Sequence, residues 1–292
     1  MSMAANTHLV NKASNKRLNE KSTTLGNMDL SGTLECHSIT ESSENVISLQ
    51  PKYIFFPPRS SVWSSSVVGD KIVVGADQKA IHFQGWRSPE RKQVCTLWVG
   101  SDIFSTAIDP RKERNLVYVG CRNGSVRVFD LNQPNIFYSA FELERKRRTV
   151  SLFSGIGHKE SSVHCMKRVS ENYLVTAAMN GEISMWDTRF IASPSTSLLS
   201  KSGTFAKPLL NIRESIFNYS TKTHFDINDQ ETLLAAENIE GKLSLWSLRT
   251  GSRIRDLDVA GPVNCIKFSK DQGGIWAAVG DQLQHWDMPE HE

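Results

Sequence analysis

Side chains that could bind a metal ion lie close together near the middle of the chain, where His158 is followed by His164 and Cys165. Imidazole and thiolate are the usual ligands of zinc, but further ligands at the spacings that zinc sites use are missing from the sequence. His158 follows Gly157, and a Gly-His pair at the start of a β repeat fits a structural hydrogen bond. We therefore expect no metal site and no cofactor.

Motifs of the common enzyme classes are also missing. The sequence contains no phosphate-binding P-loop, no H-E-x-x-H metalloprotease helix and no G-x-S-x-G nucleophile turn. We predict that the chain is not an enzyme and has no small-molecule substrate.

Arg145-Lys146-Arg147-Arg148 is the densest run of charge. It fits a solvated loop, a weak nuclear-import patch or a contact with phosphate. Four cations without neighbouring aromatics give little support for base recognition, and the net charge of +3 is small. Nucleic acid is not an expected partner.

The stretch from Leu174 to Arg189, LVTAAMNGEISMWDTR, reads as two strands and the turn between them. Asn180-Gly181 is a strong hairpin signal, because a type I′ turn needs two residues that tolerate a positive φ. The residues after the turn alternate up to Trp186, with the period of two that is typical of a strand.

Four further hairpins align with this one. They are IVVGADQKAIHFQ, LVYVGCRNGSVRVFDL, LLAAENIEGKLSLWSLR and IWAAVGDQLQHWDM. The second strand of each hairpin ends near an aromatic residue. These residues are Phe83, Phe129, Trp186, Trp246 and Trp286. Lead strands precede most hairpins, as in IFSTAID, SVHCMKRV, HFDIN and VNCIKFS.

Repeated hairpins of this kind predict an all-β fold. A hairpin with one apolar face is marginal alone, whereas stacking such sheets radially buries both faces. With the Gly-His and Trp-Asp signatures, the pattern predicts a WD-repeat β-propeller over residues 46–289 with five legible blades. Residues 46–66 could complete a degenerate blade. Residues 132–156 and 190–222 read as insertions, and residues 1–45 as a disordered polar tail.

The five cysteines form no C-x-x-C pair and their number is odd, so we expect reduced thiols. The N-terminal residues lack the apolar region of a secretory signal, and no apolar run is long enough to cross a membrane. We therefore expect a protein of the nucleus, the cytoplasm or both, not secreted and without a membrane partner.

The Leu174–Arg189 stretch resembles the sixteen-residue box of the DCAF group, the substrate receptors of cullin-4 RING ubiquitin ligases. The box has early apolar residues, a small pair, Asp or Asn before Gly, alternating aliphatics and then Trp-Asp-x-Arg. All of these positions are matched here, with Asn180-Gly181 in the turn and Trp186-Asp187-Thr188-Arg189 at the end. The order of features from Val62 to Trp286 is similar to the same group.

The resemblance implies a non-enzymatic receptor that recruits a protein substrate. It implies that Arg189 docks on the damaged-DNA-binding-protein adaptor with a free guanidinium on an exposed rim, where Asp187 and Thr188 fix the turn. Arg249, in the partial box of the next hairpin, could widen this positive rim. His158, Asn180, Gly181, Trp186, Trp246 and Trp286 are expected to be structural residues of the blades.

An alternative stays open, because many WD repeats end in W-D-x-[KR] without any role in a ligase. The chain could be a general WD-repeat scaffold in another nuclear or cytoplasmic complex, for instance in RNA processing or chromatin. In the sequence, Arg189 is the residue that separates the two functions.

Overall fold

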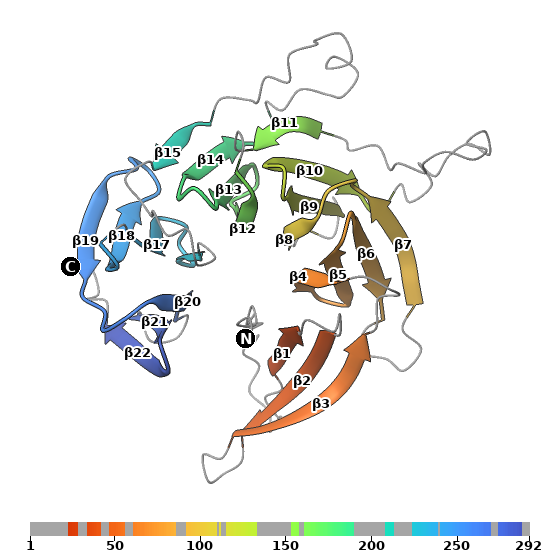
Figure 1. The fold of residues 1–292 in the computed structure, drawn as a ribbon, viewed down its shortest axis with the longest axis horizontal. Helices are drawn as coiled ribbons and strands as arrows, with labels where there is room; N and C mark the ends of the chain where they lie inside the picture. Colours follow the sequence, from red (N-terminus) through yellow and green to blue (C-terminus); the bar gives the residue numbers. More distant parts are fainter. Residues whose placement is uncertain are drawn as a thin grey trace. The chain divides into compact units, whose positions relative to one another are not determined.

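The computed structural model describes residues 23–28, 34–41, 47–55, 61–85, 92–109, 111, 115–132, 153–157, 161–189, 208–212, 224–238, 240–269 and 274–287. Residues 23–55 within these ranges and residues 153–157 are described by their backbone alone. The described residues form 22 β-strands and no helix, arranged in antiparallel sheets of three or four strands (Figure 1). The prediction of an all-β chain is therefore confirmed.

The chain divides into two compact units, residues 1–117 with 130–150 and residues 118–129 with 151–292. The first unit holds the sheet of β1 (Thr23–Met28), β2 (Leu34–Glu41) and β3 (Ile47–Phe55) and the sheet of β4 (Val62–Val68), β5 (Lys71–Ala76), β6 (Lys79–Gln84) and β7 (Lys92–Trp98). Residues of both units form the sheet of β8 (Ile103–Ile108), β9 (Leu116–Cys121), β10 (Ser125–Asp130) and β11 (Phe153–Gly157).

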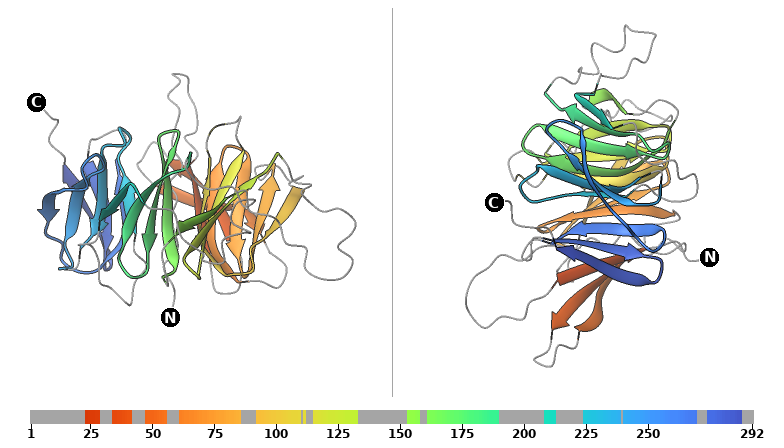
Figure 2. Two further views of the ribbon diagram at one scale, coloured as in Figure 1. Left: turned by 90° about the horizontal axis from the view of Figure 1, so that it is seen from above. Right: turned by 90° about the vertical axis from the view of Figure 1, so that its left-hand side faces the viewer.

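The second unit holds three further sheets. These are β12 (Val163–Val169), β13 (Tyr173–Ala178), β14 (Ile183–Asp187) and β15 (Leu210–Ile212); β16 (Phe225–Ile227), β17 (Leu233–Glu237), β18 (Leu243–Ser247) and β19 (Arg253–Leu257); and β20 (Val263–Phe268), β21 (Gly274–Val279) and β22 (Gln282–Asp287). In each sheet the strands lie side by side in chain order (Figure 2). All five predicted hairpins and all four predicted lead strands are confirmed as strand pairs and first strands of these sheets.

The sheet β16–β19 is buried on both faces. Leu234 and Trp246 pack in one apolar cluster with residues of β12–β15. Ala235 and Leu245 point the other way and pack in a second cluster with residues of β20–β22. Because successive strand residues face opposite sides, burial of both faces explains why β17 reads as a continuous apolar run and not as an alternation.

The hairpin turns carry glycine in the left-handed region. Gly181 has φ +85° and Gly241 has φ +74°. Each glycine N–H donates to the carbonyl oxygen three residues earlier, at 3.0 Å. Asn180 does not share the positive φ, so the predicted type I′ turn is wrong. Residues 179–181 form the three-residue loop in which a type I turn is followed by one left-handed residue.

The side chain of Asn180 explains this difference. Its Oδ1 accepts the backbone N–H of Glu182 at 3.2 Å. Such a local bond satisfies Asn180 in an ordinary backbone conformation, and the positive φ falls to Gly181, which adopts it at no steric cost.

Two expectations about the N-terminal part differ from the structure. Strands β1 and β2 lie inside residues 1–45, for which we expected disorder, and pair with each other and with β3. Residues 46–66 do not make one degenerate blade, because β3 belongs to the sheet of β1 and β2 whereas β4 begins the next sheet. Pro57-Pro58 separates β3 from β4 in the sequence, and proline lacks the N–H that a strand ladder needs.

The fourth strands of the sheets were not predicted. β11 overlaps the supposed insertion 132–156, and β15 lies inside the supposed insertion 190–222. These strands are short, with 5 and 3 residues, so they show too few residues for a period of two to be recognised. The basic run 145–148 lies outside the described residues.

Candidate functional site

Trp186 fixes β14 against β13 from within the sheet. Its side chain is 3% exposed, and its indole Nε1–H donates to Thr176 Oγ1 at 2.8 Å. Thr176 is itself fully buried on β13. A buried N–H without a partner costs about 1–3 kcal/mol, so the bond removes a penalty that burial of the indole would bring. Burial and this hydrogen bond fit the structural role expected of Trp186.

The turn after β14 is tied to the start of its own hairpin. Thr188 donates to the carbonyl oxygen of Asn172 twice, from the backbone N–H at 2.7 Å and from Oγ1 at 2.8 Å. Asp187 Oδ1 accepts the backbone N–H of Arg189 at 2.9 Å. Asp187 and Thr188 thus hold the turn, and the side chain of Arg189 leaves the sheet from a fixed backbone position.

The guanidinium of Arg189 folds back onto Asp187. Nη2 lies 2.6 Å from Oδ2, and Nε lies 3.0 Å from Oδ1. The Arg189 side chain is 53% exposed, whereas that of Asp187 is only 6% exposed. The expected exposure of Arg189 agrees with the structure, but the expectation of a free guanidinium is wrong. The carboxylate that caps the turn lies within reach of the guanidinium fork and binds two of its donors.

This ion pair sets the protonation of the turn. The hydrogen bond from Arg189 lowers the pKa of Asp187 below its ordinary value, against the opposing effect of burial. The pKa of Arg189 is raised by the same hydrogen bond, with a smaller contribution from Tyr173. Asp187 is therefore ionised at neutral pH, and the pair as a whole is electrically neutral.

The corresponding turn after β18 lacks the carboxylate. Ser247 stands in the place of Asp187, and its Oγ accepts the backbone N–H of Arg249 and of Thr250, each at 3.3 Å. A hydroxyl can cap the turn but cannot pair with a cation. Arg249 is exposed. Ser247 carries no charge, so it does not neutralise the positive charge of Arg249 as Asp187 does that of Arg189.

The remaining predicted residues differ in how the structure places them. Asn180 and Gly181 shape the β13–β14 turn, as described above. Trp246 is buried, but the position on β17 that corresponds to Thr176 on β13 is Ala236, which has no hydroxyl to offer the indole. Trp286 is only partly buried against the core. His158 lies outside the described residues.

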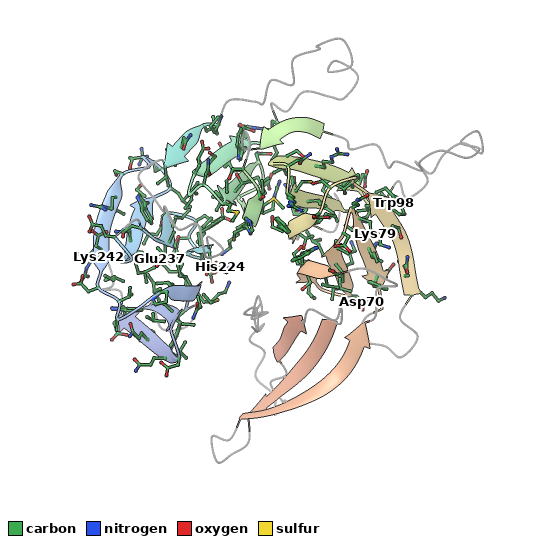
Figure 3. All side chains as sticks on the ribbon, viewed as in Figure 1. Asp70, Lys79, Trp98, His224, Glu237 and Lys242 are labelled. Carbon is green, nitrogen blue, oxygen red and sulfur yellow. The ribbon has the colours of Figure 1, made fainter. Side chains whose placement is uncertain are left out.

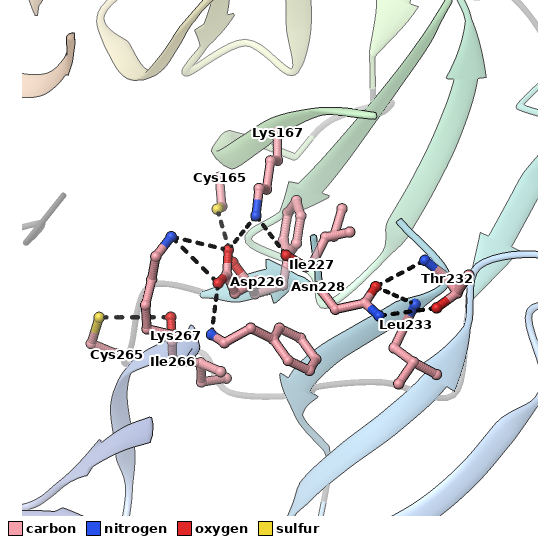
Figure 4. Close-up of polar contacts among 12 residues, drawn as sticks. Cys165, Lys167, Asp226, Ile227, Asn228, Thr232, Leu233, Cys265, Ile266 and Lys267 are labelled. Carbon is pink, nitrogen blue, oxygen red and sulfur yellow. Dashed lines mark hydrogen bonds and ion pairs between the residues drawn. The ribbon is translucent and has the colours of Figure 1, made fainter. Parts of the chain in front are cut away.

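A polar cluster that the sequence did not predict joins the three sheets of the second unit (Figure 4). Asp226 on β16 is buried. Its Oδ1 accepts a hydrogen bond from Lys167 Nζ on β12 at 2.7 Å, and Lys267 Nζ on β20 lies 3.4 Å from Oδ2. The backbone N–H of Phe268 donates to Oδ2 at 2.9 Å. One carboxylate therefore links three first strands, and the cluster keeps one positive charge in excess.

A repeat in the sequence could have revealed this cluster. The first strands β12 and β20 both contain Cys-x-Lys, as Cys165-Met-Lys167 and Cys265-Ile-Lys267. Asp226 is the acid within the apolar first strand between them. Two cations and one acid at corresponding places of adjacent repeats predict an ion pair across the repeats.

Cysteine and histidine meet in one buried pair. Cys95 Sγ lies 3.9 Å from His82 Nδ1. Burial, and then the charge of Lys71, lower the pKa of His82 to about 4. Burial raises the pKa of Cys95 to about 11. Both groups are neutral at pH 7, and a neutral thiol is a weak nucleophile.

The thiol near the Asp226 cluster is also protonated. Burial raises the pKa of Cys165 to about 11, and its Sγ lies 3.9 Å from the carbonyl oxygen of Phe225. In the described ranges no group of three or more His, Cys, Asp or Glu side chains could hold a metal ion.

Trp98 is the largest exposed aromatic on an outer strand of the described residues. It lies on β7 opposite Lys79 of β6, and the Lys79 ammonium stands 5.7 Å from the centre of its ring (Figure 3). A cation over an exposed indole contributes about 0.5–1 kcal/mol. The exposed ring therefore already has a partner within its own sheet.

No protein-family model matches the chain, and no curated protein matches it. The part of the chain that the structure describes contains no helix that is long and apolar enough to cross a membrane.

Proposed function

We propose that the chain is a WD-repeat β-propeller and works as a protein-interaction scaffold of the nucleus, the cytoplasm or both. Specifically, it is a substrate receptor of a cullin-4 RING ubiquitin ligase, not itself an enzyme, that docks on the damaged-DNA-binding-protein adaptor through Arg189. Its partners are this adaptor and a protein substrate.

The propeller proposal is supported by the repetition of one kind of sheet. Within the second unit, antiparallel sheets with strands in chain order stack face to face and share apolar clusters. Propeller blades are built and packed in this way. Such folds present turns from successive blades as binding surfaces, which fits a scaffold.

The receptor proposal depends on one observation. The complete box ends in an arginine that is more than half exposed and whose backbone is fixed by Asp187 and Thr188. Ordering a mobile side chain at an interface costs about 0.5–1.5 kcal/mol. The bidentate pair with Asp187 orders Arg189 before a partner arrives, and this reduces that cost.

Binding to the purified adaptor tests the proposal. We expect the wild-type chain to bind in a calorimetric or fluorescence titration. An interface arginine can contribute about 2 kcal/mol, so Arg189→Ala should weaken binding by roughly thirtyfold. Arg249→Ala should cause a smaller loss, because Arg249 lies in the partial box of the next hairpin.

Arg255→Ala is the matched control, since it removes the same charge from an exposed position on β19. It should bind the adaptor as wild type does. Melting curves of all variants show whether each is folded. If wild type does not bind, the receptor proposal fails and the general WD-repeat scaffold takes its place. If wild type and Arg189→Ala bind equally well, the role of Arg189 is wrong.

A further inference from the structure

The sheet β20–β22 has three strands, whereas the sheets β4–β7, β8–β11, β12–β15 and β16–β19 have four. Among the described residues, no strand pairs with the outer edge of β22. An unpaired edge offers a row of backbone N–H and C=O groups to any extended chain that can lie beside it.

The burial of equivalent leucines shows what this edge lacks. Leu243 on β18 and Leu283 on β22 both stand three residues before the tryptophan of their strand. Leu243 is 0% exposed, whereas Leu283 is 67% exposed. Leu243 has Leu257 of the fourth strand β19 directly opposite, and it also packs in an apolar cluster with residues of β20–β22. Of the strands that the structure describes, none places a side chain opposite Leu283 on the outer edge of β22.

The residue opposite this position of the third strand is aliphatic in every four-stranded sheet. The pairs between third and fourth strands at this position are Ala80–Leu97, Val126–Ile156, Ile183–Ile212 and Leu243–Leu257. A fourth strand beside β22 should therefore place leucine or isoleucine opposite Leu283.

The charges around β22 indicate the neighbours of this aliphatic residue. Acidic residues stand at both ends of the strand, at Asp281 and Asp287, and the strand itself contains no lysine or arginine. The Asp287 side chain is 89% exposed. On β19 the residue opposite Trp246 is Arg253. A basic residue opposite Trp286 would thus lie beside Asp287 and match its charge.

A second copy of the chain fits this edge less well. To place Leu283 opposite an aliphatic residue, an antiparallel copy must present its own Leu283. That register pairs only residues 282–284 of each β22 and leaves the tryptophan end of both strands uncovered.

We propose that the outer edge of β22 binds an extended segment of a partner protein as an antiparallel fourth strand. The segment has leucine or isoleucine opposite Leu283 and arginine or lysine near Asp287. This site is independent of the proposed adaptor contact, because it uses another sheet and none of the residues of the Arg189 turn.

The fourth strand of the neighbouring sheet is the natural probe. A fluorescein-labelled peptide of residues 252–259, SRIRDLDV, carries both the aliphatic and the basic residues. Titration with the full chain should raise its anisotropy to saturation. Leu257→Asp in the peptide, or Leu283→Asp in the protein, should weaken binding at least tenfold. Asp287→Arg should weaken it about threefold or more, because it reverses the charge.

Met179→Asp is the control, since Met179 is also an exposed apolar residue but lies in the β13–β14 turn. This variant and Arg189→Ala should bind the peptide as wild type does. Hydrogen exchange of the amides of residues 282–287 should slow when the peptide is bound.

Three results would overturn the proposal. The first is that wild type does not bind the peptide. The second is that wild type, Leu283→Asp and Asp287→Arg all bind it equally well. The third is a concentration-dependent dimer in sedimentation velocity that Leu283→Asp abolishes, since a second copy would then occupy the edge. Loss of adaptor binding with intact peptide binding would contradict only the receptor proposal.

Discussion

The sheets β12–β15 and β16–β19 share one architecture but differ in where they place polar groups. Leu174 pairs with Trp186 in the first sheet as Leu234 pairs with Trp246 in the second. In both sheets the end of the third strand and the turn after it read Trp-x-x-Arg. Only the first sheet gives its tryptophan a threonine partner and its arginine a carboxylate, because Ala236 and Ser247 stand at those places in the second.

This difference separates what the fold requires from what a site adds. The aromatic residue and the turn glycine occur in both sheets, so they belong to the repeat itself. The hydroxyl of Thr176 and the carboxylate of Asp187 are specific to the first sheet, and the carboxylate holds the guanidinium of Arg189 at the end of β14. An ordered side chain suits a binding site, since a contact residue is then already in place.

The largest effect on stability is expected at Asp226, whose carboxylate pairs with Lys167 and Lys267 and so connects neighbouring sheets. Asp226→Asn leaves Lys167 and Lys267 without their shared carboxylate. Removal of one partner of a buried ion pair costs about 3–5 kcal/mol. Each lysine side chain is about one-third exposed, so we expect a smaller loss, about 2–3 kcal/mol in the free energy of unfolding.

Urea denaturation followed by circular dichroism measures this loss. Asp258→Asn is the matched control, because Asp258 pairs with Lys242 at 3.4 Å and its side chain is 91% exposed. The control should unfold as wild type does. Equal stability of Asp226→Asn and wild type would mean that the cluster does not hold the sheets together.

An intermediate effect is expected at the hydrogen bond that only the first sheet has. Thr176→Val keeps the shape of the side chain but leaves the indole N–H of Trp186 buried without a partner, which should destabilise the chain by about 1–2 kcal/mol. Ala236 at the corresponding place of β17 is fully buried, so a threonine there would overpack the core and is no neutral control. A loss well below about 1 kcal/mol for Thr176→Val in urea denaturation would contradict the role assigned to this hydrogen bond.

The local parts of this comparison could be predicted from the sequence. The alternation up to Trp186 and the glycine at position 181 are properties of neighbouring residues, so the hairpin and the place of its turn were expected correctly, although the type of the turn was not. The cluster around Asp226 joins side chains from three strands that are far apart in the sequence. Its prediction needed the three repeats to be aligned and compared at one position.

The conformation of Arg189 was missed for a different reason. Its sequence context correctly suggested exposure, but exposure does not determine whether a side chain is paired. The decisive fact is that the Asp187 carboxylate already bonds the backbone N–H of Arg189. The same carboxylate is then close enough to bind the guanidinium, and this depends on the turn geometry and not on the motif.

The smallest effect on stability is expected from exchanging the residues that cap the two turns. Asp187→Ser should release the guanidinium of Arg189, and Ser247→Asp should capture that of Arg249. Ion pairs at the surface contribute little, so each change should shift Tm by no more than about 1–2 °C at physiological salt. Thermal unfolding at low and at high salt measures the shift, which should decrease as salt screens the pair.

The pH dependence gives the sign of this contribution. The pKa of Asp187 is lower in the folded chain than its ordinary value, so the ion pair stabilises the folded state above that ordinary value. The contribution is lost as pH falls through the folded pKa. The difference in Tm between wild type and Asp187→Ser should therefore be present at pH 7 and decrease progressively in acid. A difference that persists unchanged into strong acid would show that the hydroxyl and the carboxylate differ as turn caps and not as partners of Arg189.

Binding of Asp187→Ser to the adaptor completes the test. If the ion pair orders Arg189 for its partner, this variant should bind more weakly than wild type but more tightly than Arg189→Ala. Tighter binding than wild type would mean that Asp187 competes with the adaptor for the guanidinium.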